Sequence, residues 1–278
     1  MPKVTVLLPV YNGEAFLEEA VNSVLRQSFR DFELLIMDDG STDNTLSVAG
    51  RFKDPRIRLE KRQHDFIGNL NEGIRLAQGK YIARMDADDI MHTERLRVQV
   101  GVMEKNPEIA VCGSWMKNFG EGIVPGVVRS FNGEISFPLL QLLKGNILFH
   151  PTILLRKSFI TRNRIRYEDY PCAEDYKLYL EIARHGGNFY VEPQVLLFYR
   201  NSALQVTYCK REKMEETSRR IGMETVGLLL ERFSDEKVKT IVNALLGAEE
   251  QGIVSSETLR KVLFEIFHRL TVRPPHTR

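Results

Sequence analysis

The sequence has few cysteines and no long apolar run. Its 278 residues include three cysteines that are far apart and odd in number, Cys112, Cys172 and Cys209. This pattern indicates reduced, mostly buried thiols rather than a disulfide framework or a zinc site. No secretory signal is visible, and no stretch approaches the roughly 20 apolar residues that a transmembrane helix needs. We therefore expect a cytoplasmic protein that does not cross a membrane.

Two glycine-rich phosphate-binding motifs are also absent. Neither GxGxxG nor GxxxxGK followed by Ser or Thr occurs, which argues against a dinucleotide-binding fold and a P-loop. The formal net charge is only +2 at pH 7, so no strong field argues for a nucleic acid partner. Because no glycine-rich loop is present to bind phosphates, a phosphorylated ligand would need a metal ion to hold them.

The first hundred residues alternate between strand and helix patterns. Strands are predicted at 3–10, at 32–41, where the strand runs into a turn, at 56–62, and at 80–89, where the strand ends in carboxylates. Helices are predicted at 13–28, at 68–78 and from Thr93 to just before Pro107. Ser41, Thr42 and Asp43 can cap a further helix. This order predicts an α/β fold with a mostly parallel, Rossmann-like sheet flanked by helices. Ligands of such sheets bind beyond the carboxyl ends of the strands.

The second half is less regular. Strands are predicted at 109–119 and 150–159, a glycine-rich loop at 120–133, a helix at 173–186, and a strand or hairpin at 188–200. After about residue 205 the segments are charged and helical. We therefore expect a helical C-terminal extension.

An acidic cluster follows the fourth predicted strand, in the sequence YIARMDADDI. Asp86 and Asp88 lie two positions apart, so both can face one site where the strand ends. Carboxylate oxygens favour Mg²⁺ or Mn²⁺ over zinc. Because Mg²⁺ usually completes its shell with substrate phosphates, this pattern indicates a diphosphate ligand. The alternative is a solvated acidic turn.

Three other positions carry candidate chemistry. Asp39, after the second strand, can accept hydrogen bonds from a ribose or a base, although helix capping is an alternative. Tyr11, after the first strand, can stack on a base or simply pack at the rim. Glu174 and Asp175 begin a predicted helix, where a carboxylate can be a general base or only complement the helix dipole.

Three stretches together resemble family-2 glycosyltransferases with the GT-A fold: residues 4–45, YIARMDADD and EDYKLYLEIA. The resemblance covers roughly residues 3–200 and implies a GT-A domain at 1–205 and a helical extension at 206–278. It implies inverting transfer, with Mg²⁺ or Mn²⁺, from a nucleotide-diphospho-sugar, expected to be a UDP-sugar. The implied acceptor is a hydroxyl of a saccharide or lipid-linked saccharide, in bacterial surface polysaccharide or glycolipid synthesis.

The resemblance also assigns roles to single residues. In the nucleotide-sugar site it implies that Pro9, Tyr11 and Asn12 line the nucleoside pocket. It also implies that Asp39 contacts the base and that Asp86 faces the ribose. It makes Asp88 the metal ligand and Asp175 the catalytic base. Four further residues are candidates for this site: Arg84, Asp89, His150 and Glu174. For His150 the alternative is a hydrogen-bonded histidine at the start of a strand.

Two other functions remain open from the sequence. A sugar nucleotidyltransferase would need a glycine-rich loop bearing Lys or Arg after the first strand, which LLPVYNGEAF lacks. A non-catalytic nucleotide-sugar-binding protein is the second.

In the segment 259–273, one side is apolar and could lie peripherally on the inner membrane face, or pack within the protein. The apolar residues are Leu259, Val262, Leu263, Ile266, Phe267 and Leu270.

Overall fold

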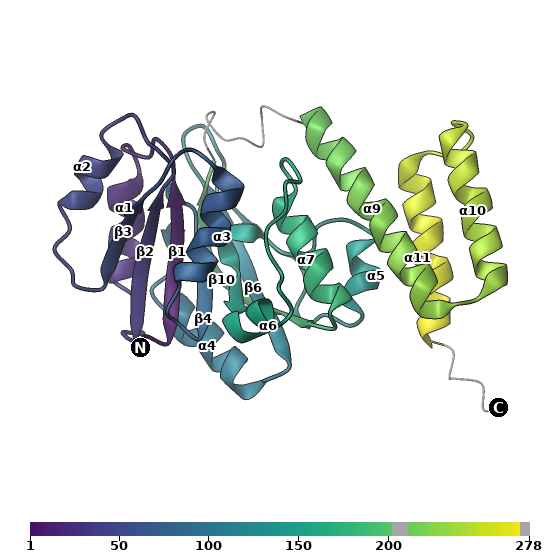
Figure 1. The fold of residues 1–278 in the computed structure, drawn as a ribbon, viewed down its shortest axis with the longest axis horizontal. Helices are drawn as coiled ribbons and strands as arrows, with labels where there is room; N and C mark the ends of the chain where they lie inside the picture. Colours follow the sequence, from purple (N-terminus) through teal and green to yellow (C-terminus); the bar gives the residue numbers. More distant parts are fainter. Residues whose placement is uncertain (202–210, 273–278) are drawn as a thin grey trace.

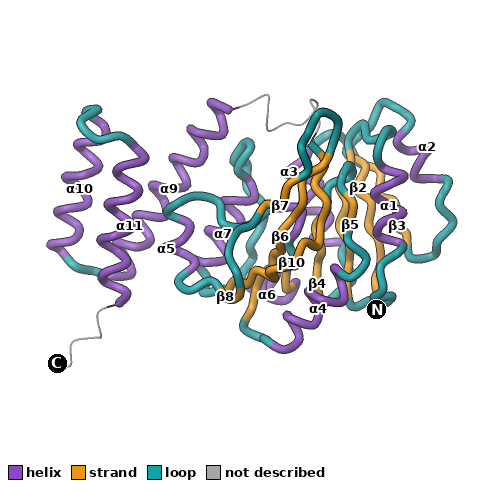
Figure 2. The backbone as a smooth tube through the Cα atoms, turned by 180° about the vertical axis from the view of Figure 1, so that it is seen from behind, coloured by secondary structure: helices purple, strands orange, loops and turns teal. Residues whose placement is uncertain are grey.

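The computed structural model describes residues 1–201 and 211–272. Its centre is one ten-stranded sheet with the order β3-β2-β1-β4-β9-β6-β10-β5, and β7 and β8 pair with β6 and β10. Figure 2 shows this sheet from behind, with three C-terminal helices on one side of it. The strands are β1 (Val4–Val10), β2 (Phe32–Asp38), β3 (Ile57–Lys61), β4 (Tyr81–Arg84), β5 (Ile90–Met91), β6 (Ile109–Phe119), β7 (Gly126–Val128), β8 (Gly133–Glu134), β9 (Leu154–Arg156) and β10 (Asn188–Arg200).

Helices cover both faces of the sheet (Figure 1). One apolar core lies under α1, α2 and α4, and the other lies under α3, α5, α7 and the C-terminal helices. The helices are α1 (Leu17–Leu25), α2 (Thr45–Gly50), α3 (Phe66–Leu76), α4 (Arg95–Lys105), α5 (Pro138–Leu142), the short 3₁₀ helix η1 (His150–Thr152), α6 (Lys157–Arg162), α7 (Glu174–Arg184), α9 (Arg211–Phe233), α10 (Glu236–Glu250) and α11 (Ser256–Val272).

The central strands explain the apolar runs in the sequence. Every residue of β1 and β2 is buried, as expected for strands covered on both faces. β1 pairs in parallel with both β2 and β4, so the carboxyl ends of all three strands meet at one edge. The predicted α/β fold, with a mostly parallel sheet in its first half and a helical C-terminus, is confirmed.

The segment 150–159 is not the single strand that the sequence predicts. It forms η1, then the three-residue strand β9, then α6. Pro151 lies in the first turn of η1, where a missing N–H is tolerated. β9 lies between β4 and β6 and pairs with both in the antiparallel direction. His150 therefore lies in a helical turn rather than on a strand.

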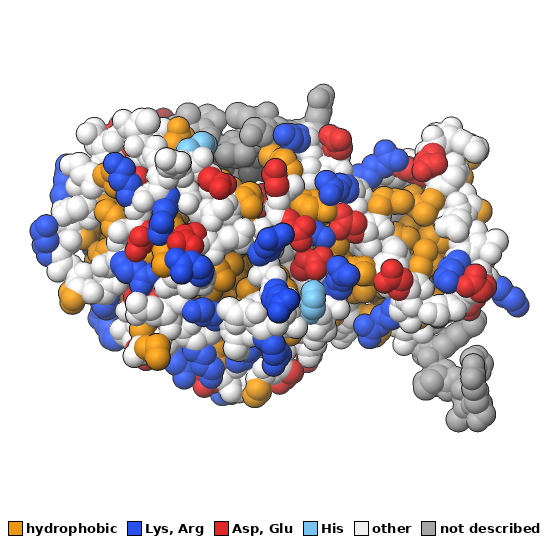
Figure 3. All heavy atoms as spheres, in the orientation of Figure 1, with side chains coloured by type: hydrophobic (Ala, Val, Ile, Leu, Met, Phe, Trp, Pro, Cys, Tyr) orange, Lys and Arg blue, Asp and Glu red, His pale blue; other side chains and the backbone are white. Residues whose placement is uncertain are grey.

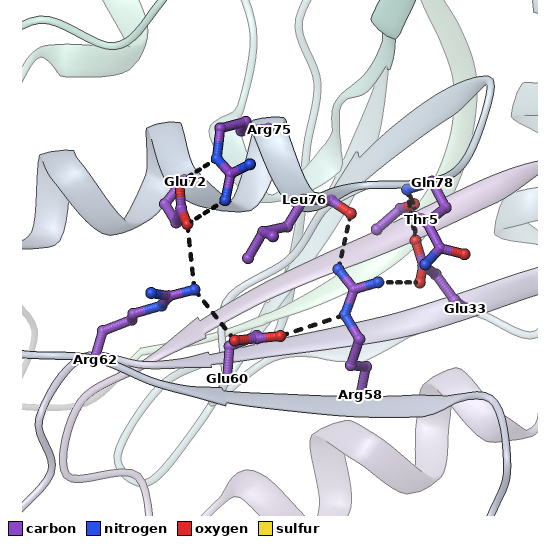
Figure 4. A network of polar contacts seen from close by, with 9 residues as sticks. All are labelled: Thr5, Glu33, Arg58, Glu60, Arg62, Glu72, Arg75, Leu76 and Gln78. Carbon is purple, nitrogen blue, oxygen red and sulfur yellow. Dashed lines mark hydrogen bonds and ion pairs between the residues drawn. The ribbon is translucent and has the colours of Figure 1, made fainter.

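The edge strand β3 carries charged side chains that bind to its neighbours (Figure 4). Arg58 donates to the carbonyl of Leu76, at the end of α3, and pairs with Glu33 on β2. Arg62 pairs with Glu72 on α3. These contacts tie β3 to β2 and to α3, and charges on an edge strand oppose pairing with another chain.

The C-terminal helices share the core of the sheet domain. Side chains of α9 and α11 belong to the same buried cluster as those of α5 and α7. Lys177 of α7 is nearly buried and pairs with Glu224 of α9 at 2.7 Å. The predicted boundary between residues 205 and 206 lies outside the described residues, as does Cys209. Cys112 is buried and Cys172 is partly exposed, and both are free thiols.

No helix in the described portion is long and apolar enough to cross a membrane. On the apolar side of α11, Leu259, Leu263 and Phe267 are buried within the protein, and Val262 is 37% exposed. Acidic and basic side chains are mixed over these helices on the face drawn in Figure 3. This arrangement favours packing within the protein over membrane contact as the role of the apolar side.

Replacing Phe267 by Ala tests whether α11 is part of the core. Phe267 is fully buried, so we expect a loss of about 3–5 kcal/mol in the free energy of unfolding. The matched control Val262→Ala, on the same helix, should cost about 0.5 kcal/mol. Urea unfolding followed by circular dichroism measures both values. Equal losses in the two variants would contradict the shared core.

Candidate active site

The loops after β1 and β2 are joined by hydrogen bonds. The N–H of Asn12 donates to Ser41 Oγ at 2.9 Å, and the N–H of Thr42 donates to Asn12 Oδ1 at 2.8 Å. Asn12 has a positive φ of 50°, which turns the loop toward β2. Of the three residues predicted to cap α2, Asp43 accepts the N–H of Thr45, the first residue of the helix, at 3.0 Å, whereas Ser41 and Thr42 bind the neighbouring loop instead. The two loops form a prearranged wall at the carboxyl edge of the sheet.

Asp39 lies beneath this wall and is already hydrogen-bonded. Its Oδ1 accepts from the N–H of Asp65 at 2.7 Å and from the side chain of Asn69. His64 Nδ1 lies 3.0 Å from Asp39 Oδ2, and the His64 ring contacts the ring of Tyr11 at a tilt of 37°, with ring centroids 4.5 Å apart. The structure thus brings Tyr11 and Asp39 together through His64. Pro9 is buried within β1 just before them.

Neither His64 nor Asn69 was identified from the sequence. Asn69 lies on α3, and His64 lies in the loop that leads to it. No local pattern connects these positions with Asp39, because only the packing of α3 on the sheet brings them there. A base bound beside Tyr11 and Asp39 would meet both side chains.

The three aspartates after β4 form one cluster. Carboxylate oxygens of Asp86, Asp88 and Asp89 all lie within 4.8 Å of one another. Asp89 is fully buried, and its Oδ2 has no hydrogen-bond partner among the described residues. Burial and the charges of Asp86 and Asp88 raise the pKa of Asp89 well above its ordinary value. Oxygen ligands and an unsatisfied buried carboxylate fit a hard divalent cation such as Mg²⁺ or Mn²⁺.

Two arginines lie against this cluster. Arg84, at the end of β4, is nearly buried and pairs with Asp86 at 2.6 Å. Burial opposes its charge, but the Asp86 carboxylate raises the pKa of Arg84 above its ordinary value. Arg200, at the end of β10, donates its backbone N–H to Asp89 Oδ1 at 2.9 Å. The sequence did not identify Arg200, which reaches the cluster only because β10 pairs with β5.

Glu174 and Asp175 begin α7 and face the same site. Asn146 donates to Asp175 Oδ2 at 2.7 Å, which fixes that carboxylate. Burial, together with the charge of Asp175, raises the pKa of Glu174 to about 7, and burial also raises the pKa of Asp175. Arg84 lowers both pKa values, so its charge acts on this pair as well as on the acidic cluster.

His150 is hydrogen-bonded within the protein. Its Nε2 lies 2.7 Å from the hydroxyl of Tyr167. Burial and the charge of Arg84 lower the pKa of His150 well below its ordinary value, so the ring is neutral. Asn71 holds Tyr167 in place through its side chain, which bonds both the N–H and the carbonyl of that residue. This geometry fits the hydrogen-bonded alternative for His150.

The fold and site define a class: an α/β protein with an acidic DxD-type cluster and further polar side chains at the carboxyl edge of its sheet. The family model for glycosyl transferase family 2 matches residues 5–168. An uncharacterized glycosyltransferase of Haemophilus influenzae is 30% identical over 97% of this chain and 87% of its own length. The chain belongs to glycosyl transferase family 2.

Other relatives agree with this family. The putative glycosyltransferase EpsE of Bacillus subtilis is 36% identical over 56% of this chain and 57% of its own length. The structure of S. aureus TarS in complex with UDP-GlcNAc matches 82% of this chain and 66% of its own, with 21% identity and a TM-score of 0.68. A mannosyltransferase of Pyrobaculum calidifontis, in complex with GDP-Man and Mn²⁺, matches 99% and 81%, with 17% identity and a TM-score of 0.59. The fold is therefore of the GT-A type.

The raised pKa of Glu174 predicts a pH dependence of stability. The pKa is about 7 in the folded protein and ordinarily 4.5, so folding favours the protonated carboxyl. This contribution is fully present below pH 4.5 and is lost as the pH rises through 7. Glu174→Gln removes this pH-dependent contribution. The stability of the variant relative to the native protein should therefore rise as the pH goes from about 5 to about 8.

Urea unfolding at the two pH values measures this gain. Glu121→Gln, at an exposed loop position, is the control and should follow the native protein at both pH values. If Glu174→Gln behaves like this control, the carboxyl of Glu174 has an ordinary pKa and the prediction is wrong.

Proposed function

We propose that this protein transfers a sugar from a UDP-sugar to an acceptor hydroxyl, with inversion at the anomeric carbon and with Mg²⁺ or Mn²⁺. The observation that carries the proposal is the cluster of Asp86, Asp88 and Asp89, which follows β4 at the sheet edge shared with β1 and β2 and whose Asp86 acts electrostatically on Glu174. Membership of glycosyl transferase family 2 supports sugar transfer. The TarS complexes with UDP and UDP-GlcNAc support the uridine donor.

The nucleotide binds at the joined loops after β1 and β2. Tyr11, which is 49% exposed, offers its ring to the base, and Asp39 offers a buried carboxylate beside it. Pro9 and Asn12 shape the pocket, since Asn12 fixes the loop through Ser41 and Thr42. This wall needs little rearrangement on binding, which lowers the entropic cost of ordering it.

The acidic cluster lies where the diphosphate of the donor would end. Asp88 would hold the divalent ion, with Asp86 facing the ribose and Asp89 buried behind them. When bound, the ion supplies a positive charge that neutralises the departing diphosphate. The Mn²⁺ complex of the Pyrobaculum calidifontis mannosyltransferase supports this assignment.

Asp175 accepts the proton of the acceptor hydroxyl as that oxygen attacks the anomeric carbon. Attack comes from the face opposite the leaving diphosphate, which inverts the configuration. Asn146 keeps the Asp175 carboxylate oriented for this step. Arg84 favours the ionised form of Asp175, since it lowers the pKa that burial raises. The acceptor, the pathway of surface polysaccharide or glycolipid synthesis, and peripheral membrane contact stay predictions.

Asp88→Ala tests the metal site. We expect the variant to lose the Mn²⁺-dependent thermal stabilisation by UDP and to lose sugar transfer, because the remaining carboxylates cannot hold the ion. Asp169→Ala, at an exposed position before α7, is the matched control and should retain both. Full activity of Asp88→Ala with excess chelator present would refute the metal role.

Asp175→Asn tests the division of labour in the site. Donor binding should persist because the substitution keeps the shape of the side chain, whereas turnover should fall by at least about 10²-fold. Titration with UDP and an assay of transfer or donor hydrolysis measure the two properties. Loss of donor binding would contradict the assignment of Asp175 to the acceptor side.

Two outcomes with the native protein would favour the other functions. Release of pyrophosphate from a nucleoside triphosphate and a sugar phosphate would identify a nucleotidyltransferase. Tight binding of nucleotide sugars without transfer or hydrolysis would identify a non-catalytic binding protein.

A further inference from the structure

Arg200 joins the end of β10 to the turn that carries the aspartates. Its side-chain Nε donates to the carbonyl of Asp88 at 2.7 Å, and its backbone N–H donates to Asp89 Oδ1 at 2.9 Å. The pairing of Phe198 with Ile90 in the antiparallel β10–β5 ladder places Arg200 opposite Asp88. More than one hundred residues of sequence separate these groups.

The guanidinium of Arg200 lies between two aromatic rings. It is 4.4 Å from the ring centroid of Phe16, before α1, and 4.5 Å from that of Phe119, at the end of β6. It also pairs with Glu19 on α1. A planar cation held between two rings and fixed by hydrogen bonds has few other orientations available. The side chain therefore connects α1, β6, β10 and the aspartate turn.

We infer that Arg200 is a positioning residue for the metal-binding turn. Its Nε bonds the backbone carbonyl of Asp88, so this contact sets the position of residue 88 within the turn. Its positive charge also offsets the repulsion among the three carboxylates. Arg84 differs, because it pairs directly with the Asp86 carboxylate. This inference rests on the proposed function, since it takes the cluster as the site of a divalent ion.

The conservative change to lysine should not preserve this role. A lysine ammonium is a single point of charge on a flexible stem, whereas the guanidinium bonds Asp88 through Nε and Glu19 through a terminal nitrogen at the same time. It also cannot stack as a plane between Phe16 and Phe119.

Mn²⁺ binding to the full chain with saturating UDP tests the inference, with free Mn²⁺ read by electron paramagnetic resonance. We expect Arg200→Lys to weaken Mn²⁺ binding by about 10- to 100-fold, as for other residues that orient metal ligands. Phe119→Leu removes one ring without changing charge and should weaken binding by a smaller factor. Glu19→Gln removes only the partly exposed pair and should stay within about twofold of the native protein.

The outcomes separate this inference from the proposed function. Native protein that binds no Mn²⁺ with UDP would overturn both the metal role and the inference. Native protein that binds Mn²⁺, with Asp88→Ala that does not, supports the metal site. If Arg200→Lys then binds Mn²⁺ like the native protein, the inference alone is wrong. If thermal unfolding shows that Arg200→Lys does not fold, Phe119→Leu decides, and native affinity in that variant overturns the inference.

Discussion

The mutual repulsion of three carboxylates is the constraint on which the site depends. Asp86, Asp88 and Asp89 place oxygens within 4.8 Å of one another at a partly buried strand end. Burial and the charges of Asp86 and Asp88 raise the pKa of Asp89, so the three carboxylates stay ionised together only beside positive charge. Arg84 and Arg200 supply part of that charge from two different strands. The remaining carboxylate oxygens suit a divalent ion. In the proposed function, that ion relieves the repulsion and binds the diphosphate of the donor.

Around this cluster the candidate side chains are held by hydrogen bonds from other segments. The loops after β1 and β2 are joined through Asn12, and Asp39 is fixed by groups from the segment that leads into α3. On the other side, Asn146 orients Asp175. Each candidate side chain is thus held by a partner far away in sequence, which is how the fold converts a sheet edge into a binding site.

The C-terminal helices contribute to this arrangement through α7. Lys177 lies less than one turn after Asp175 and pairs with Glu224 of α9, while Tyr170, just before α7, donates its hydroxyl to the same carboxylate. Because these contacts bracket Glu174 and Asp175 in sequence, α9 supports the helix end that carries the pair. The sequence indicated only a charged helical extension, because pairing between α7 and α9 leaves no local pattern.

The sequence by itself determined the alternation of strands and helices in the first hundred residues, the parallel part of the sheet, and the positions of Asp39, Asp86, Asp88 and Asp175 near element ends. Apolar periodicity and the placement of carboxylates are local, so they can be read along the chain. Only the tertiary structure decided that residues 150–159 divide into η1, β9 and α6, and that Ser41 and Thr42 bind a neighbouring loop. It also brought His64, Asn69 and Arg200 to the site, because hydrogen bonds between distant segments exist only after the sheet has formed.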